Sequence, residues 1–462
     1  MNPEAAGTGS ADAGSAYASP AEAGPAYASP AEAGPADAGP SDAGPVHVLV
    51  PAPGSLRLDT PEGRRRELAR LLTFAERSLP DPQAPYVALD GRGKPDPGQG
   101  HPLLITTRMT HVFGLAVLLE LPGADRFVSA GLAALRGPLR DVEHGGWFAG
   151  VGAGPGYRPS DAVKQMYGHA FVVLAGASAA TAGVPGGREL LDEALDVIER
   201  YFWDEESGAC RESFDAAWQH SEAYRGANSN MHAVEAFLAA VDAGADPVWA
   251  ERALRIAERL VDQEAAAHRW RMPEHYDERW LVDLEYAADS PADPFRPYGV
   301  TVGHLLEWSR LLVHLEAALE HPPSWLAADA RGLIDTALDI GWRTDGHPGL
   351  VYTLDEEDRP VVAQRMHWVA AEAVLAADTM ARRAGEPAYA ATARELWRDV
   401  ERFVDLEHGS WQHELAPEGA PASTVWSGKP DVYHAFQAVL LPDLPLAPSV
   451  AGAVVAGHST PG

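Results

Sequence analysis

The sequence pairs histidines with carboxylates at helical spacing. His232 precedes Glu235 by three residues, and His304 precedes Glu307 by the same interval. Residues three apart share a helix face, so each pair would present an imidazole and a carboxylate together. Imidazoles suit proton transfer, because their unperturbed pKa of about 6.5 lets them accept and donate protons near neutral pH. The alternative for either pair is a solvent-facing polar surface or a capped histidine in the core.

Two more side chains could act in the same cavity. His434 ends the segment WSGKPDVYH, in which a Gly-Lys-Pro-Asp turn opens the last predicted helix. Arg108 stands among apolar residues of another predicted helix, in ITTRMTH. A guanidinium that faces a pocket can donate several hydrogen bonds to hydroxyl groups. The alternative for Arg108 is an ion pair on the surface.

Trp368 and Glu372 lie four residues apart and therefore on one face of a predicted helix, where core packing would also explain the tryptophan. The sequence contains 18 histidines, but it has no His-Glu-x-x-His motif and only one cysteine, Cys210. The cysteine-rich zinc patterns are therefore excluded, and a catalytic metal is not expected. No phosphate-binding glycine loop lies between a strand and a helix, so we expect no nucleotide cofactor.

Composition restricts the partners and the compartment. In a chain of 462 residues, 66 acidic residues oppose 36 basic ones, which gives a formal charge of −30. Nucleic acids and anionic membranes are poor partners for such a surface. The single cysteine allows no internal disulfide, and no apolar run approaches the roughly 20 residues that span a bilayer. We expect a cytoplasmic protein.

Residues 1–45 differ from the remainder of the chain. They contain no Lys or Arg, and the decapeptide AYASPAEAGP occurs there twice in tandem. Small residues and proline bury too little apolar surface to offset chain entropy, so we expect a disordered low-complexity tail. Residues 46–462 are expected to form one catalytic domain.

The remainder of the chain is repetitive and helical. Apolar periodicity predicts twelve helices in six hairpins, and aromatic, glycine-rich loops recur between them every 60 to 70 residues. We expect an all-α fold, an (α/α)6 barrel with short β-hairpins or loops at the active-site end; the pattern alone would also fit an open solenoid. The helical stretches begin near residue 58 and continue over 101–121, 124–137, 161–183, 188–203, 228–244, 247–263, 301–321, 325–342, 364–385, 387–404 and 430–441.

Six motifs resemble the N-acylglucosamine 2-epimerase superfamily, and within it the branch of aldose–ketose isomerases that includes mannose isomerase and sulfoquinovose isomerase. The resemblance covers about residues 58–455 and implies an (α/α)6 barrel that interconverts free aldoses and ketoses without a metal or other cofactor. In chain order the motifs are ITTRMTH (105–111), GGWF (145–148), YRGANSNMHAVEAF (224–237), EHYD (274–277), GHLLEW (303–308) and WSGKPDVYH (426–434).

The resemblance also implies site residues. The central histidines and glutamate of the superfamily fall on His232, His304, Glu307 and His434, and its sugar-binding arginine falls on Arg108. Further substrate-binding positions fall on Asn228, Trp368, Glu372 and His413.

Three positions depart from the sulfoquinovose branch. Leu104 stands where that branch carries Trp, and His413 and Pro430 stand where it carries Gln. The last two changes remove the amides associated with the sulfonate end of that sugar. A free neutral hexose is therefore the expected substrate, with D-mannose and D-fructose as the interconverted pair.

The reaction requires a proton to move between carbons 1 and 2 of the open-chain sugar. We expect His434 to be the base that moves it through a cis-enediol. We expect His304, oriented by Glu307, to be the acid and base that opens the ring. His232 and Arg108 would hold and polarise the oxygens on which negative charge develops.

Other functions fit parts of the pattern. A sugar 2-epimerase would return the proton to the same carbon, and a sulfoquinovose isomerase would use the same groups. An inverting glycosidase would need two carboxylates roughly 6.5–9.5 Å apart, for which Glu307 and Glu372 are candidates. A solenoid scaffold would have no buried histidine cluster. A monosaccharide is the expected ligand, and the chain is expected to be a monomer or a homodimer.

Overall fold

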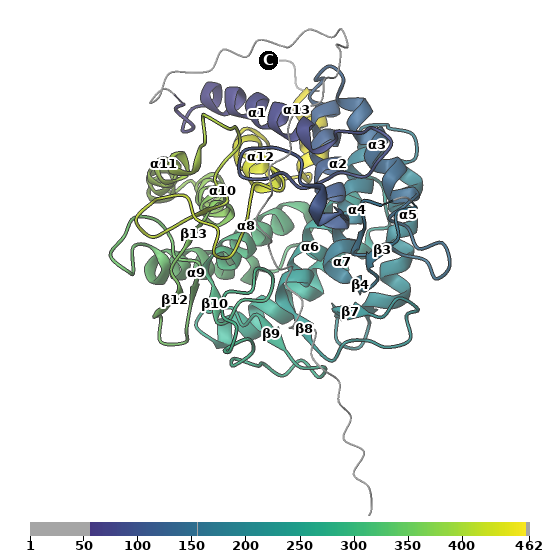
Figure 1. Cartoon of the computed structure of the whole chain (residues 1–462). Coiled ribbons are helices and arrows are strands. Elements are labelled where there is room, and N and C mark those ends of the chain that lie inside the picture. The colour runs from purple at the N-terminus through teal and green to yellow at the C-terminus, as the bar shows by residue number, and fades with distance from the viewer. Residues whose placement is uncertain (1–55, 155, 459–462) are drawn as a thin grey trace, which may run out of the picture. The chain divides into compact units, whose positions relative to one another are not determined.

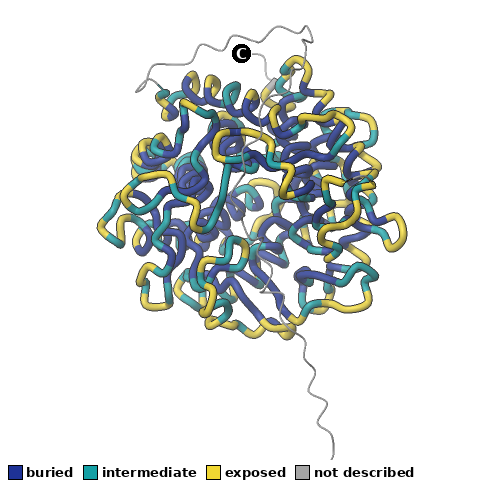
Figure 2. The backbone as a smooth tube through the Cα atoms, in the orientation of Figure 1, coloured by how far each residue is buried: buried dark blue, intermediate teal, exposed yellow. Residues whose placement is uncertain are grey.

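Six helices that are buried on nearly every side form the inner ring of the protein. The computed structural model describes residues 56–154 and 156–458. Helices that are apolar all round must be enclosed by other elements, and these six occupy the middle of Figure 1 and the dark-blue interior of Figure 2. They are α2 (Leu103–Leu118), α4 (Met166–Thr181), α6 (Ala227–Asp242), α8 (Val302–Ala318), α10 (His367–Ala384) and α12 (Tyr433–Leu440).

Six further helices are apolar on one face only and pack outside the inner ring. In α3, for example, the buried Phe127, Val128, Leu132 and Leu135 share one face. The α5 and α7 helices continue as π-helical turns over Ile198–Phe202 and Glu258–Ala265. The outer helices are α1 (Pro61–Ala75), α3 (Ala124–Arg136), α5 (Gly187–Val197), α7 (Val248–Ala257), α9 (Trp325–Gly341) and α11 (Pro387–Val400).

The ring is closed, which confirms the (α/α)6 barrel and rules out the open solenoid. Each inner helix packs against the next, and α12 returns to pack against α2. The expectation of six sequential hairpins was wrong, because only five pairs are hairpins and the sixth pairs α1 with α12 from opposite ends of the chain. A ring made from one chain can close only where its first and last elements meet. Glu67 of α1 contributes to this closure by accepting a hydrogen bond of 2.7 Å from Trp411 Nε1.

Short antiparallel strands precede five of the inner helices. They are β1 (His101–Pro102), β4 (Lys164–Gln165), β8 (Arg225–Gly226), β10 (Val300–Thr301) and β13 (Arg365–Met366). Their respective partners are β2 (Gly150–Val151), β7 (Ser213–Phe214), β9 (His275–Tyr276), β11 (Thr353–Leu354) and β14 (Glu414–Leu415). Because each strand leads directly into a helix, these hairpins stand at the amino ends of the inner helices.

Three other strands complete the sheets. β3 (Pro159–Asp161) extends the first pair, β12 (Pro360–Val362) extends the fourth, and β5 (Trp203–Asp204) pairs with β6 (Ala209–Cys210). Single 3₁₀ turns occupy Glu76–Ser78, Pro97–Gln99, Glu401–Phe403 and Leu441–Asp443.

A thirteenth helix, α13 (Val450–His458), packs on α2, α4 and α6 and was not expected from the sequence. Its sequence, VAGAVVAGH, has no charged face from which a helical period could be recognised. The expected tail at residues 1–45 lies outside the described residues. None of the described helices is both long and apolar enough to cross a membrane.

Gly332 in α9 provides a test of the packing. A Cβ added there would lie 1.2 Å from the indole Nε1 of Trp270. Alanine normally stabilises a helix interior by about 1 kcal/mol relative to glycine, but overpacking costs about 1–3 kcal/mol. Gly332→Ala should therefore lower the free energy of unfolding, as measured by urea denaturation. Gly457→Ala in α13 is the control, because a Cβ there meets no atom within 4 Å; equal stability of the two variants would contradict this account.

Candidate active site

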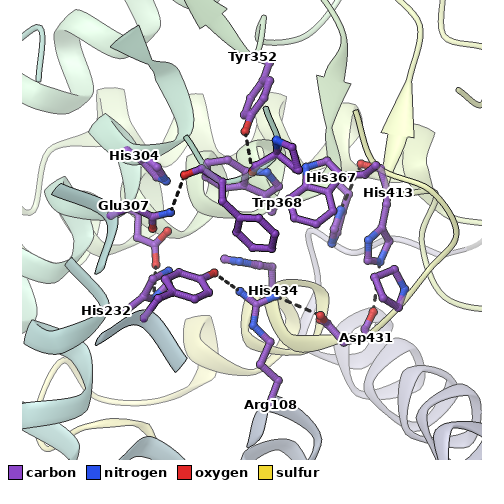
Figure 3. A pocket seen from close by; sticks show the side chains of 16 residues that line it. Arg108, His232, His304, Glu307, Tyr352, His367, Trp368, His413, Asp431 and His434 are labelled. Atoms are coloured by element: carbon purple, nitrogen blue, oxygen red, sulfur yellow. Dashed lines mark hydrogen bonds and ion pairs between the residues drawn. The ribbon is translucent and has the colours of Figure 1, made fainter. Parts of the chain in front are cut away.

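One cavity lies at the amino ends of the inner helices and collects most of the residues expected from the sequence. Arg108, Asn228, His232, His304, Glu307, Trp368, His413 and His434 all line it (Figure 3). The remaining lining residues are Tyr167, Pro294, Phe295, Tyr352, His367, Trp426, Pro430 and Asp431. The cavity therefore joins side chains from α2, α4, α6, α8, α10 and α12.

The position of these residues along their helices follows one rule. Arg108, His232, His304, Trp368 and His434 all lie within the first two turns of an inner helix. The amino end of a helix carries partial positive charge. Several such ends converge here, so the cavity favours a group that acquires negative charge.

His304 is held by a carboxylate that the sequence analysis did not select. Its Nδ1 lies 2.9 Å from Oε1 of Glu274, which directly precedes β9. The expectation that Glu307 orients His304 was wrong, because Glu307 lies one helical turn further on and contacts Arg310 instead. A carboxylate accepts the proton of Nδ1, so Nε2 is the nitrogen of His304 that remains available to a ligand.

His434 has the same arrangement with a different carboxylate. Its Nδ1 lies 3.2 Å from Oε1 of Glu372, whose Oε2 accepts a hydrogen bond of 2.8 Å from Arg310 Nε. Glu372 is completely buried and does not line the cavity. The expectation that it binds substrate was therefore wrong, and it supports His434 instead. Burial, together with the charge of Arg108, holds the pKa of His434 well below its usual value. His434 is therefore neutral near pH 7 and able to accept a proton.

Trp368 packs between the two supported histidines. Its ring centroid lies 5.2 Å from that of His304 and 5.7 Å from that of His434. The indole is buried and also lines the cavity. Trp368 therefore packs in the core and belongs to the pocket, whereas the sequence left these as alternatives. A ligand resting on this indole has one imidazole at each side.

A buried charge cluster lies beside the cavity. Arg310 Nη2 is 3.5 Å from Oε1 of Glu307, and Nδ1 of His232 lies 3.6 Å from Oε2 of Glu235 and 3.9 Å from Oε1 of Glu307. Burial and the nearby charge of Glu372 raise the pKa of Glu307 well above its usual value. Burial alone would also raise the pKa of Glu235, but its contacts with His232 and Arg310 hold it below the usual value. Glu235 is therefore ionised, and Glu307 favours its protonated form.

Two groups of these side chains have the spacing of cation ligands. They are His232, Glu235 and Glu307, and Glu307, Glu372 and His434, with donor atoms within 4.8 Å of one another. The guanidinium of Arg310 already contacts Glu307 and Glu372 from within the cluster. It therefore supplies positive charge to the same acidic side chains that a metal ion would contact. The absence of a metal cofactor stays a prediction.

Arg108 is buried in the cavity wall, so the alternative of a surface ion pair was wrong. It donates hydrogen bonds of 3.0 Å to Asp431 Oδ2 and 2.9 Å to the Tyr167 hydroxyl. Burial alone would raise the pKa of Asp431, but the charge of Arg108 holds it below its usual value. Asp431 therefore anchors Arg108 as a carboxylate.

Several polar atoms of the lining residues are buried without a hydrogen-bond partner in the described part of the chain. A buried polar atom left unpaired costs about 1–3 kcal/mol. A small ligand with several hydroxyl groups would satisfy such a set of donors and acceptors. The atoms are Arg108 Nε, Asn228 Oδ1, His232 Nδ1, Glu307 Oε2, His367 Nε2 and Trp426 Nε1.

The sequence analysis missed several of these residues. Glu274 and Asp431 lay inside the recognised motifs EHYD and WSGKPDVYH, so their signal was present but was not used. Tyr167 and Phe295 had no comparable signal, because neither belongs to a motif or a spaced pair. Of the three departures from the sulfoquinovose branch, His413 and Pro430 line the cavity and Leu104 does not.

His413 predicts a pH dependence of stability. Burial lowers its pKa to about 3, whereas an unfolded histidine titrates at about 6.5. The unfolded state therefore binds one more proton than the folded state between these values, and the stability present above pH 6.5 is lost as pH falls. His413→Gln should remove up to about 1.4 kcal/mol per pH unit from the slope of unfolding free energy between pH 6 and 4. Urea denaturation at several pH values measures it, and identical slopes for variant and wild type would contradict the assignment.

Comparison with known proteins identifies the family. The family model for N-acylglucosamine 2-epimerase matches residues 85–438. The chain is 56% identical over 390 residues to the D-mannose isomerase of Thermobifida fusca, covering 84% of this chain and 95% of the relative. It superposes on a crystal structure of D-mannose isomerase with a TM-score of 0.76 and 25% identity, covering 84% of this chain and 98% of the other. The cellobiose 2-epimerase of Spirochaeta thermophila shares the fold with a TM-score of 0.71 at 23% identity, over 88% and 100% of the two chains. The chain belongs to the N-acylglucosamine 2-epimerase family.

Proposed function

We propose that this enzyme interconverts D-mannose and D-fructose by histidine acid–base catalysis through a cis-enediol or enediolate, without a metal. The observation that carries the proposal is the pair of carboxylate-backed imidazoles, His304 and His434, which both contact one indole in a single cavity. Isomerisation of a sugar needs two such groups, because protons move both on oxygen and on carbon. The similarity to D-mannose isomerases supports the choice of sugar.

Ring opening is the first step that we assign. The pyranose opens when an acid protonates the ring oxygen and a base removes the proton of the anomeric hydroxyl. His304 suits this step, because its Nδ1 is held by Glu274 and its Nε2 is directed to the cavity side. With Nδ1 fixed in this way, Nε2 can give a proton to the ring oxygen and take one from the anomeric hydroxyl.

Proton transfer between carbons is assigned to His434. Its burial favours a neutral imidazole, which can remove the proton of carbon 2 and return it to carbon 1. Glu372 stabilises the imidazolium formed in between, and Arg310 fixes Glu372 in turn. Removal of the carbon-bound proton leaves negative charge on the sugar oxygens, which Arg108, His232 and the converging helix ends can stabilise.

A neutral sugar fits the cavity better than a sulfonated one. Arg108 is the cationic side chain of the lining, and its guanidinium is engaged by Asp431. Burial keeps His413 neutral, and Pro430 offers no donor in place of an amide. A sulfonate would therefore meet, among the lining residues, one guanidinium whose charge is already balanced by Asp431. Sulfoquinovose isomerisation is a weaker alternative for this reason.

Two other activities are distinguished by the same geometry. An inverting glycosidase would need Glu372 to face the substrate, but this carboxylate lies behind His434 and outside the cavity lining. A 2-epimerase would use the same two histidines, and this chain shares its fold with a cellobiose 2-epimerase. The products separate the two reactions, because mannose gives fructose by isomerisation and glucose by epimerisation.

The activity test uses D-mannose labelled with deuterium at carbon 2, after treatment of the enzyme with a chelator. We expect fructose as the main product with some deuterium at carbon 1, and His434→Ala should lower kcat by at least about 100-fold. His321→Ala is the matched control, because this side chain is 90% exposed. Circular dichroism checks that both variants fold. Formation of glucose instead of fructose would contradict isomerisation. Dependence on added metal would contradict a reaction without a metal, and an active His434→Ala variant would contradict the role of His434.

A further inference from the structure

A second cavity of about 270 Å³ lies behind His304. Its inner wall contains the buried residues Met272, Pro273, Glu274, His275 and Val300. Its rim contains the exposed residues Arg269, Asp283, Leu284 and Glu356. The cavity therefore connects a buried wall of the protein with solvent.

Glu274 separates the two cavities. Its Oε1 accepts a hydrogen bond from Nδ1 of His304, which lines the sugar cavity. Glu274 itself lines the second cavity and is not among the residues that line the first. Glu274 thus contacts His304 through Oε1 and belongs to the wall of a cavity other than the one that His304 lines.

The support of His434 is different. Both oxygens of Glu372 are bonded to protein groups, Oε1 to His434 and Oε2 to Arg310. Glu372 is completely buried and lines neither cavity. A proton on His434 therefore has no comparable route to solvent on the side away from the sugar.

We propose that Glu274 is the positioning residue of His304 and that the second cavity lets this histidine, but not His434, exchange protons with solvent while sugar fills the active site. When Nε2 of His304 takes a proton from a sugar hydroxyl, Nδ1 passes its proton to Glu274. Glu274 then passes a proton to water in the second cavity. One proton enters and one leaves, so the imidazole ends neutral with its tautomer reversed. The reverse sequence supplies a proton to the ring oxygen.

The role of this difference between Glu274 and Glu372 rests on the proposed function. The difference explains why the two histidines would have different roles in that reaction. Protons on sugar oxygens exchange with water in any case, so an open route at His304 has no cost. A proton taken from carbon 2 must reach carbon 1, and a histidine whose carboxylate has no route to solvent loses less of it on the way. The geometry therefore matches His304 to the oxygen protons and His434 to the carbon proton.

Chemical rescue tests the proposal. Glu274→Ala should lower kcat for D-mannose by about 10- to 100-fold with little change in KM, because the group lost contacts the histidine and not the sugar. Sodium formate should enter through the second cavity, replace the carboxylate and restore kcat in a saturable manner. Sodium chloride at equal ionic strength should not restore it. Glu274→Gln keeps a hydrogen-bond acceptor but cannot pass a proton, so it should stay impaired.

Glu372→Ala is the matched control. It also removes a carboxylate from a histidine, but formate has no route to that position when sugar fills the cavity. Rescue of both variants, or of neither, would overturn the proposal, as would full activity of Glu274→Ala or Glu274→Gln. Retention of deuterium from carbon 2 in the fructose formed should be equal in wild type and Glu274→Ala. A lower retention in the variant would show that the carbon proton passes through His304.

The wild type, assayed first with mannose, separates this proposal from the proposed function. A wild type that makes no fructose contradicts the function. A wild type that makes fructose, with a Glu274→Ala variant that formate does not rescue, contradicts the second cavity alone. If the wild type epimerises instead, the same rescue is measured on glucose formation.

Discussion

The active site depends on the buried guanidinium of Arg310. It holds Glu372 against His434 and also contacts Glu307, so one guanidinium joins acidic side chains from two neighbouring inner helices. A buried carboxylate without such a partner would be protonated or would destabilise the fold by several kcal/mol. Burial raises the pKa of Glu372 and the charge of Arg310 opposes this rise, so Arg310 favours the carboxylate form that accepts the Nδ1 proton of His434 and leaves Nε2 for chemistry. Arg310 therefore acts on catalysis through a carboxylate that does not itself line the cavity.

The barrel supplies the second constraint. Short strands lead into five inner helices, and their pairing fixes where each of these helices begins. Side chains in the first two turns of separate helices consequently meet in one cavity, although they are far apart in the sequence. Ring closure through α1 and α12 brings His434 beside α2 and Arg108. An open solenoid with the same helices would leave these groups at opposite ends.

The two supported histidines differ in what surrounds their carboxylates. Glu372 is sealed by Arg310, whereas Glu274 borders a second cavity with an exposed rim. The reaction that we propose moves two kinds of proton, of which only the carbon-bound kind must be kept from water. Two chemically identical side chains, His304 and His434, can therefore have different roles in one fold, because solvent reaches the carboxylate partner of one and not that of the other.

Sequence alone determined the helices of the barrel and half of the residues that line the cavity. Apolar periodicity depends on local spacing, so it predicted twelve of the thirteen described α-helices. The resemblance to the family predicted eight of the residues that line the cavity. The partners of those residues could not be predicted, because a spacing of three residues says that His304 and Glu307 share a face but not which carboxylate reaches the imidazole. Glu274 lies 30 residues from His304, and Glu372 lies 62 residues from His434. Only the tertiary structure decided these contacts, as it decided the pairing of α1 with α12, because each depends on where ring closure brings distant segments of the chain.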